Sequence, residues 1–283
     1  MDSIYLDNNA TTPLLPAVWE AMRPFLTDIF GNPASAHRIG RRARQALEDA
    51  RERCALLLGA FPDELVFTSG ATEANNLALF GLTHSSSPGH LLCSPIEHPS
   101  VAEPIRRLAE AGWTVDYFPV DSTGTVHPEA LAGLLRSDTR LVTVMLANHE
   151  TGTLQPVAAL AEQLEGRVPF HCDAVQAAGK VPFSFHDLGV TTLTISAHKF
   201  HGPKGAGGLL VRRGSRLPPQ MFGGHQQQGR RPGTEAVALA VGLVAALESW
   251  HREAEARTKY VRRLRHLLLG QLQAAPGPVV LNG

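Results

Sequence analysis

Apolar runs of strand length alternate with helical segments along most of the chain, and this alternation limits the folds open to it. Strand patterns occur at residues 64–68, 90–94, 114–119, 141–147, 168–172, 192–195 and 206–211. Helical patterns occur at 16–26, 37–58, 99–111 and 157–164, and up to residue 82 after the turn at 69–72. The run 141–147 is almost wholly apolar, which is typical of a parallel strand buried on both faces. The sequence predicts an α/β domain with a mostly parallel central sheet flanked by helices.

Two long helices are expected near the end of the chain, at 235–257 and 259–273, with the charged stretch 252–257 separating them. The longest apolar run, Ala236 to Leu247, lies in the first of these segments. It is too short to span a bilayer and predicts a core helix. A short strand at 279–282 is expected to follow, and a chain that finishes on a fresh strand looks interrupted.

Composition excludes several classes of protein. Hydrophobic residues make up 43% of the 283 residues, too many for a disordered chain. Basic and acidic residues number 26 each, so no net field favours nucleic acid or an anionic membrane. The N-terminus lacks the plan of a signal peptide. The three cysteines, Cys54, Cys93 and Cys172, are widely spaced, which predicts buried thiols in a reducing, cytoplasmic setting and no structural zinc site.

Ligands of parallel α/β sheets bind beyond the carboxyl ends of the strands. The segment Ser69-Gly70-Ala71-Thr72-Glu73 stands at such an end, before a helix. Gly70 lets the backbone approach an anion, the start of the helix offers free N–H groups, and Thr72 adds a hydroxyl. The alternative is an ordinary helix start that Thr72 caps.

A second polar cluster, 171–176, follows another predicted strand. Its acid, Asp173, could be a metal ligand, a helix cap or the partner of a cation. A pyridoxal 5′-phosphate (PLP) enzyme needs a carboxylate beside the pyridine nitrogen, because a protonated nitrogen makes the ring an electron sink. Asp173 fits that need, and Gln176, about one turn on, could reach the phenolic oxygen of the ring. A capping aspartate is the alternative.

The third cluster, 194–205, places Lys199 after a buried strand, beside Ser196 and His198 and before a Gly-Pro pair. Burial and nearby cations lower the pKa of an amine and so favour its nucleophilic form, which suits covalent attachment of PLP. Ser196 and His198 could donate to its phosphate. His198 and His201 lack a third metal ligand at a natural spacing, and the glycines lack the order of a nucleotide-binding loop. A solvated lysine in a turn is the alternative.

Together these clusters make the chain resemble the cysteine desulfurases, which are aminotransferase-like PLP enzymes of fold type I. The matching stretches fall in family order across nearly the whole chain. They are 5–13, 31–35, 67–73, 97–98, 173–176, the Lys199 segment and 229–234. The resemblance implies a fold type I PLP-transferase fold with PLP as cofactor.

Carried over residue by residue, the resemblance assigns the PLP phosphate to Ala71 and Thr72, together with Ser196 and His198. It assigns Thr234 to the phosphate of a partner subunit, because the active sites of this family lie at a homodimer interface. The bare sequence does not imply that interface.

For the ring of the cofactor, the resemblance implies that His98 stacks on its face, that Asp173 pairs with the pyridine nitrogen and that Gln176 binds the phenolic oxygen. Lys199 is implied as the lysine that holds PLP covalently. Lys199, His98 and Asp173 are thus the expected catalytic residues. No metal is implied.

The chain departs from the family pattern at Asn148-His149-Glu150-Thr151-Gly152. The family usually has two asparagines before this Glu-x-Gly, and the second binds near the phenolic oxygen, so His149 stands at a binding position. Because imidazole can donate the same hydrogen bond, we expect the exchange to be tolerated.

A second departure concerns domains. The resemblance implies an N-terminal segment, 1–15, associated with a small α+β domain, a large PLP-binding domain, 16–256, and the start of the small domain, 257–283. The remainder of the small domain, with the catalytic cysteine loop and the arginine that binds the substrate carboxylate, is expected to be absent. We therefore expect this chain to bind PLP without completing sulfur transfer.

The reaction implied by the resemblance takes sulfur from L-cysteine, leaving L-alanine and enzyme-bound sulfur for iron–sulfur cluster assembly or another transfer. L-cysteine would displace Lys199, whose freed amine removes the α-proton. A homodimer and a sulfur-acceptor or iron–sulfur scaffold protein are the expected partners, with no nucleic acid and no membrane. Two other interpretations stay open: another PLP-dependent lyase or aminotransferase of the same fold, and a non-catalytic PLP-binding or scaffold protein.

Overall fold

The computed structural model describes residues 4–84, 87–277 and 279–281. In these residues the strand patterns form one seven-stranded sheet in the order β1-β7-β6-β5-β4-β2-β3. The strands are β1 (Leu65–Thr68), β2 (His90–Cys93), β3 (Thr114–Tyr117), β4 (Thr139–Thr143), β5 (Phe170–Asp173), β6 (Thr192–Ser196) and β7 (Gly207–Val211). All pairings are parallel except those of β7, which runs antiparallel to both of its neighbours. The predicted mostly parallel sheet is confirmed.

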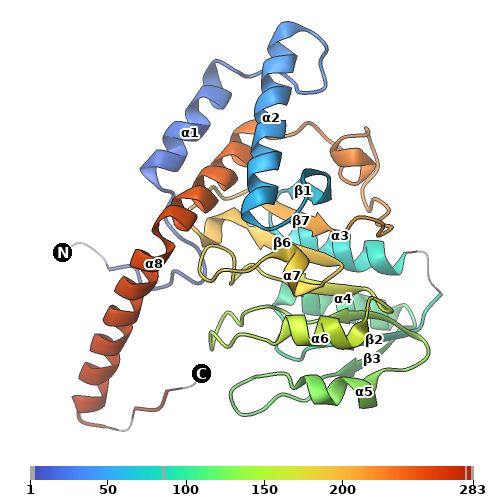
Figure 1. The fold of residues 1–283 in the computed structure, drawn as a ribbon, viewed down its shortest axis with the longest axis vertical. Helices are drawn as coiled ribbons and strands as arrows, with labels where there is room; N and C mark the ends of the chain where they lie inside the picture. The colour runs from blue at the N-terminus through green and yellow to red at the C-terminus, as the bar shows by residue number, and fades with distance from the viewer. Residues whose placement is uncertain (1–3, 85–86, 278, 282–283) are drawn as a thin grey trace.

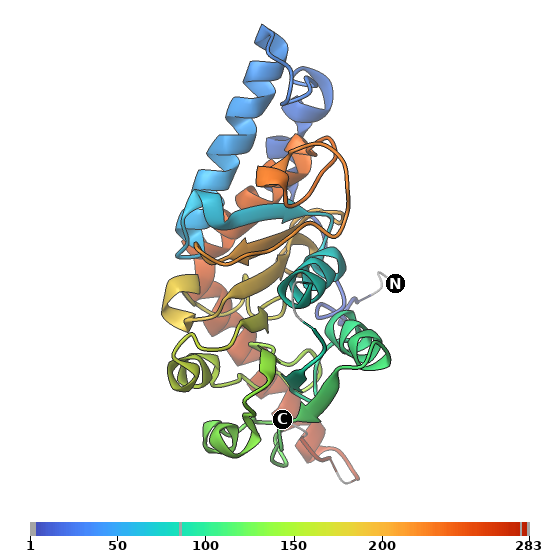
Figure 2. The ribbon, with the colours of Figure 1, turned by 90° about the vertical axis from the view of Figure 1, so that its right-hand side faces the viewer.

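Helices cover both faces of this sheet (Figures 1 and 2). Their bounds are α1 (Pro16–Thr27), α2 (Arg38–Leu57), α3 (Ala71–Thr83), α4 (Pro99–Glu110), α5 (Leu131–Leu134), α6 (Val157–Leu164), α7 (Phe185–Leu188) and α8 (Val237–Ala274). In Figure 2, α3 and α4 lie on one side of the sheet, with α6 and α7 on the other. α2 and the first half of α8 pack beside the same hydrophobic core as α6 and α7, and α1 packs on α8.

The central strands are buried on both faces, so their residues do not divide into a core face and a solvent face. Every residue of β2, β5, β6 and β7 is buried. Aliphatic side chains of these strands meet the apolar faces of the helices, whereas buried polar side chains such as His171 and Thr192 pair with each other by hydrogen bonds. The short pattern of β3, at the edge of the sheet, leaves Thr114 and Tyr117 exposed.

The carboxyl ends of six strands, all except β7, share one edge of the sheet, and this arrangement positions the site. Since β7 is antiparallel to both β1 and β6, β1 runs parallel to β6 and to the strands beyond it. The segments that follow β1, β2, β4, β5 and β6 therefore meet at that edge, and they carry the polar clusters singled out in the sequence. The residues that precede β7 reach the same edge because that strand runs the other way.

The prediction of two C-terminal helices was wrong, because α8 is one continuous helix of 38 residues. The stretch 252–258 contains no glycine or proline, and its charged residues are good helix formers. Arg257 also donates from Nε to Glu253 Oε2 at 2.8 Å, a pairing one helical turn apart that supports the helix. The predicted domain boundary between residues 256 and 257 thus falls inside a continuous helix.

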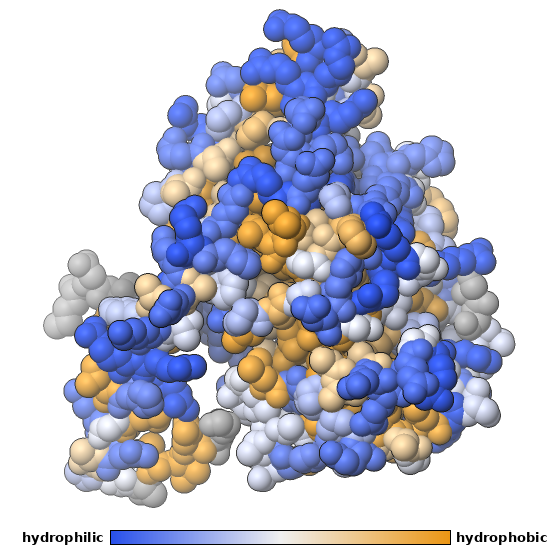
Figure 3. Space-filling view, viewed as in Figure 1, coloured by the Kyte–Doolittle hydropathy of each residue, from blue (hydrophilic) through white to orange (hydrophobic). Residues whose placement is uncertain are grey.

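The distal part of α8, residues 255–274, extends beyond the body of the molecule (Figure 1). Apolar side chains stand exposed among charged ones along it, as the orange and blue atoms at the lower left of Figure 3 show. The exposed apolar residues are Tyr260, Val261, Leu264, Leu267, Leu268 and Leu272. The first half of α8 is buried, so the prediction of a core helix for the run 236–247 is confirmed.

Of the strand predicted at 279–282, residues 279–281 have no regular secondary structure and residue 282 lies outside the described residues. Within the described ranges, none of the helices combines the length and the apolar character that a membrane crossing needs.

Candidate active site

A cavity of about 610 Å³ opens at the carboxyl edge of the sheet. Its size is within the range of small-molecule and cofactor sites. Nine of the ten predicted site residues line it, namely Ala71, Thr72, His98, His149, Asp173, Gln176, Ser196, His198 and Lys199. The structure therefore brings together side chains that are spread over more than a hundred residues of sequence.

The turn before α3 gives the cavity an anion-binding wall. Gly70 has φ +152°, a conformation that only glycine adopts readily. A Cβ on Gly70 would find only Ser196 Oγ within 4 Å, at 3.9 Å, so a side chain there would fill the cavity. Gly70 itself is the N-cap, without a side-chain cap, so the alternative in which Thr72 caps the helix is wrong. The free N–H groups of the first turn, with Ala71 and Thr72, face a site suited to a phosphate.

An ion pair fixes the first turn of α3 from outside. Arg231 donates from Nε to Glu73 Oε1 at 2.7 Å, and the backbone N–H of Ser69 donates to Glu73 Oε2 at 2.8 Å. Burial favours the neutral form of Glu73, but these hydrogen bonds outweigh it and lower the pKa of the carboxyl. Glu73 thus stays ionised and ties the turn to the loop that contains Arg231.

Asp173 ends β5 with its carboxyl group buried at the cavity. Its Oδ1 accepts from the backbone N–H of Val175 at 2.9 Å, and its Oδ2 accepts from Asn75 Nδ2 at 2.8 Å. Burial raises the pKa of Asp173, against the effect of these two hydrogen bonds. A cationic group bound in the cavity would stabilise the ionised form, so the carboxyl is suited to a protonated ring nitrogen.

The amide of Gln176 is oriented by two neighbours. Lys180 donates from Nζ to Gln176 Oε1, and Gln176 Nε2 donates to the backbone carbonyl of Asn9 at 2.9 Å. An ammonium group can only donate, so Lys180 fixes Oε1 as the accepting end of the amide and Nε2 as its donating end. Sequence reasoning missed both Lys180 and Asn9; the match of residues 5–13 to the family was the one available signal for Asn9.

Lys199 lies at the end of a short 3-10 helix, Ala197–Lys199, directly after β6. Its Nζ donates to the carbonyl of Asn9 at 2.5 Å. Burial, in spite of the carboxylates Asp173 and Asp7, lowers the pKa of the amine, which increases its nucleophilic fraction. In the neighbouring residue His198, the imidazole Nδ1 lies 3.1 Å from Thr11 Oγ1 and forms a hydrogen bond with that hydroxyl.

His98 and His149 form one wall of the cavity, with ring centroids 5.4 Å apart and an interplanar angle of 78°. His149 Nδ1 is buried and has no hydrogen-bond partner among the described residues. A buried nitrogen without a partner costs free energy unless a ligand satisfies it. The position where the sequence departs from the family pattern thus still presents a nitrogen for hydrogen bonding.

Comparison with known proteins decides the family. Residues 4–282 match the family described as aminotransferase class-V. Cysteine desulfurase IscS of Dictyoglomus turgidum is 43% identical over 283 residues, covering 99% of this chain and 72% of that protein. The solved structure of a NifS-like protein superposes with a TM-score of 0.93 at 40% identity, covering 96% of this chain and 76% of that one. A structure titled SspA in complex with cysteine superposes with a TM-score of 0.84 at 39% identity, covering 87% and 72%.

The chain belongs to the cysteine desulfurases of aminotransferase class V. Members of this family are PLP-dependent enzymes, so the predicted fold, cofactor and enzyme class are confirmed. The cavity fits this cofactor on its own evidence. The cavity is lined by the phosphate-binding groups at the start of α3, the buried carboxyl of Asp173 and the Lys199 amine, whose pKa is lowered. Because Gly70 has no side chain, the space between these groups stays open.

In this cysteine desulfurase the tenth predicted residue, Thr234, does not line that cavity. It is exposed and lines a smaller hollow with Arg231 and Gln227.

The three cysteines are unsuited to sulfur chemistry in the folded state. Cys54, Cys93 and Cys172 are buried in α2, β2 and β5, and burial raises the pKa of each thiol.

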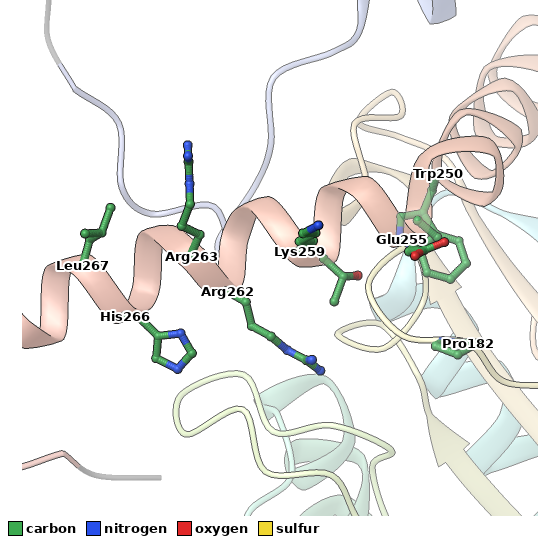
Figure 4. A pocket seen from close by; sticks show the side chains of 10 residues that line it. Pro182, Trp250, Glu255, Lys259, Arg262, Arg263, His266 and Leu267 are labelled. Atoms are coloured by element: carbon green, nitrogen blue, oxygen red, sulfur yellow. The ribbon is translucent and has the colours of Figure 1, made fainter.

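A wider hollow of about 820 Å³ runs along the distal part of α8 and shares no residue with the site of the desulfurase. Arg262 and His266 point to one side of the helix, whereas Arg263 and Leu267 point to the other (Figure 4). These side chains do not converge on a common point, which a built ligand site would require.

Proposed function

We propose that this chain binds PLP at Lys199 and activates L-cysteine, which becomes L-alanine when a thiol other than Cys54, Cys93 and Cys172 accepts its sulfur atom. The observation that carries the proposal is one cavity that joins the Lys199 amine, the buried Asp173 carboxyl and the phosphate-binding start of α3. The names of the relatives support the reaction, and a similar structure holds cysteine. When bound, PLP supplies an electron sink for the bonds around the α-carbon of an amino acid.

The residues of the chain then have separate roles. Ala71, Thr72, Ser196 and His198 bind the phosphate, and Asp173 keeps the ring nitrogen protonated by supplying a buried carboxylate. Lys199, once released from the cofactor by the incoming amine, accepts the α-proton of the substrate at Nζ. Its lowered pKa favours the neutral amine that this step needs.

On the opposite side of the site, His98 lies against the face of the ring, while Gln176 and His149 supply hydrogen bonds to the phenolic oxygen. The amide orientation that Lys180 imposes on Gln176 and the unpartnered His149 Nδ1 support both assignments.

Sulfur leaves the substrate when a thiolate supplied by a second molecule attacks its sulfur atom and forms a persulfide. The bond from sulfur to Cβ breaks, its electron pair passes to Cβ, and Cβ takes up a proton to give the methyl group of alanine. We propose that this thiolate is none of the three cysteines of the chain, because all are buried with raised pKa values. The sulfur passes onward to an acceptor or scaffold protein for iron–sulfur clusters. We propose that the protein is located in the cytoplasm, because its three cysteines are reduced and such thiols are typical of a reducing compartment.

The decisive experiment asks which amine holds the cofactor, because two lysines compete. Lys180 Nζ lies 3.0 Å from Asn9 Oδ1 and burial lowers its pKa to about 8, so it too is an activated amine. Borohydride reduction of the PLP-loaded chain should leave a pyridoxyl group on Lys199, located by peptide mass spectrometry. Lys199→Ala should lose the label and the visible absorbance band, whereas Lys180→Ala should keep the label on Lys199.

A pyridoxyl group on Lys180 in the parent chain would overturn the assignment. The substrate is tested separately by measuring alanine released from L-cysteine in the presence of an excess of a small thiol. Labelling at Lys199 without any alanine would retain the cofactor site and reject L-cysteine as substrate.

A further inference from the structure

A line of hydrogen bonds runs behind the wall of the cavity, from β6 to His98. Thr192 Oγ1 lies 2.9 Å from His171 Nδ1, and His171 Nε2 lies 3.1 Å from Asn75 Oδ1. Asn75 Nδ2 then donates to Ser100 Oγ at 2.9 Å, and Ser100 Oγ lies 2.8 Å from His98 Nδ1. All of these residues except His98 are buried. None but His98 was singled out in the sequence.

The end of this line fixes the tautomer of His98. The backbone N–H of Ser100 donates to His98 Nδ1 at 3.1 Å, and a backbone N–H can only donate. His98 Nδ1 therefore carries no proton, and the proton of the neutral ring lies on Nε2. The hydroxyl of Ser100 adds a second donor to the same nitrogen, at 2.8 Å. Nε2–H is the N–H edge that His98 can offer to the cavity.

The other end of the line fixes the direction of every hydrogen bond in it. Asn75 Nδ2 also donates to Asp173 Oδ2 at 2.8 Å, so the amide NH₂ group spans Asp173 and Ser100. With Asn75 Oδ1 turned the other way, His171 must donate from Nε2. Burial lowers the pKa of His171 to about 3, so the ring stays neutral and Nδ1 accepts from Thr192. The donors thus all point from Thr192 toward His98.

We propose that Asn75 and Ser100 are positioning residues, whose hydrogen bonds hold His98 as its Nε2–H tautomer and couple it to Asp173 through one amide. This inference rests on the proposed function, in which His98 and Asp173 face the cofactor. A neutral ring held in this way can give a proton from Nε2 into the cavity but cannot accept one there first. The tautomer thereby determines the direction in which His98 can move a proton.

The charges around His98 come from three elements. Asp173 on β5 raises the pKa of the imidazole, whereas His149 and Lys199 lower it, and burial, the largest effect, lowers it further. Glu97, next to His98 in the chain, is buried, and burial raises its pKa to about 8. A change in the titration of His98 is therefore assigned to the hydrogen-bond line only if these groups are left in place.

The test uses nitrogen-15 histidine labelling of the full 283-residue chain, with and without added PLP. Long-range proton–nitrogen correlation spectra distinguish the two neutral tautomers, and the signals of His98 are assigned with a His98→Gln sample. The parent should show the Nε2–H tautomer. Asn75→Leu removes the amide that donates to Ser100 without adding a charge, so the hydrogen bond from the Ser100 hydroxyl to His98 should weaken and the midpoint of His98 should rise by about 0.5 pH unit or more.

Asn76 provides the matched control, because it neighbours Asn75 on the same helix yet donates only to the carbonyl of Thr72, at 2.8 Å. Asn76→Ala should leave the titration of His98 unchanged. If Asn75→Leu does not fold, Ser100→Ala decides: the backbone N–H at position 100 keeps the Nε2–H tautomer, but loss of the hydroxyl donor to Nδ1 should raise the midpoint of His98 by about 0.5 pH unit or more, and Ser100→Thr should reverse this rise. An Nδ1–H tautomer in the parent, or a Ser100→Ala protein in which His98 titrates as in the parent, would overturn the proposal. These readouts do not depend on which lysine binds PLP.

Discussion

At the scale of single residues, the burial of His171 has a cost that depends on pH. Its imidazole is fully buried in β5, and burial lowers its pKa from 6.5 to about 3. Between these two values the unfolded chain binds a proton that the folded chain does not bind. The free energy of unfolding must therefore fall as the pH is lowered through this window.

We expect that His171 alone removes about 2 kcal/mol from the free energy of unfolding between pH 7.5 and pH 5. His171→Gln should abolish this part of the pH dependence, whatever it does to stability at pH 7.5. Urea unfolding curves at the two pH values measure the difference. His225→Gln, a change at an exposed histidine, serves as the control and should show the pH dependence of the parent. Equal pH dependence in all three proteins would refute the assignment.

The sequence predicted those site residues that stand directly after a strand. Asp173 and Lys199 could be predicted because a parallel sheet gathers its strand ends at one edge. Asn75 could not, because its partner Asp173 lies 98 residues away and only the packing of α3 on the sheet brings the two together. Lys180 was missed for the same reason, since its contact with Asn9 joins residues 171 apart.

At the scale of elements, the site depends on how closely β7 packs against the turn before α3. A Cβ on Gly207 would lie 2.6 Å from Gly70 Cα and 2.8 Å from Gly70 C, which are backbone atoms. Gly207→Ala must therefore displace Gly70 and the phosphate-binding end of α3. We expect its dissociation constant for PLP to rise about tenfold or more.

Gly208→Ala is the control, because a Cβ there meets side-chain atoms of Leu65 and Ile195 at 3.1 Å and 3.3 Å, which can shift. Equilibrium titration by cofactor absorbance gives both constants. The same PLP affinity for the two variants would show that the spacing between β7 and this turn is unimportant for binding.

The sequence predicted most helices and strands, because their apolar runs and the residues that begin or end helices could be recognised. It failed on α8, where a charged stretch was taken as a break. Charge alone does not end a helix: the stretch lacks glycine and proline, and Arg257 and Glu253 pair across one turn. Short elements such as α5 and α7 span four residues each, too few for a periodic pattern to be recognised.

At the scale of the whole molecule, we propose a homodimer in which each subunit completes the site of the other. Thr234 is exposed and does not line the cavity that contains Lys199, which suits a residue that serves a neighbouring subunit. Sedimentation should therefore give a dimer. Thr234→Ala should weaken PLP binding by about ten- to a hundredfold, the cost of one hydrogen bond to a charged group.

Thr258→Ala, a change on the distal part of α8, should leave PLP binding unaltered. A clean monomer that still binds PLP tightly, or a Thr234→Ala protein with the affinity of the parent, would contradict the shared site.

The contacts of Asn9 also have a consequence for the order in which the chain acquires its structure. Asn9 reaches His149, Gln176 and Lys199, which follow it by 140, 167 and 190 residues. A ribosome adding about 5 to 20 residues per second makes Lys199 about 10 to 40 s after Asn9. The N-terminal segment has none of these partners until residue 149 has been made, and it lacks the last of them until residue 199 has been made. Cofactor capture is therefore a late event in biogenesis, and a nascent chain halted before β6 would emerge without a place for PLP.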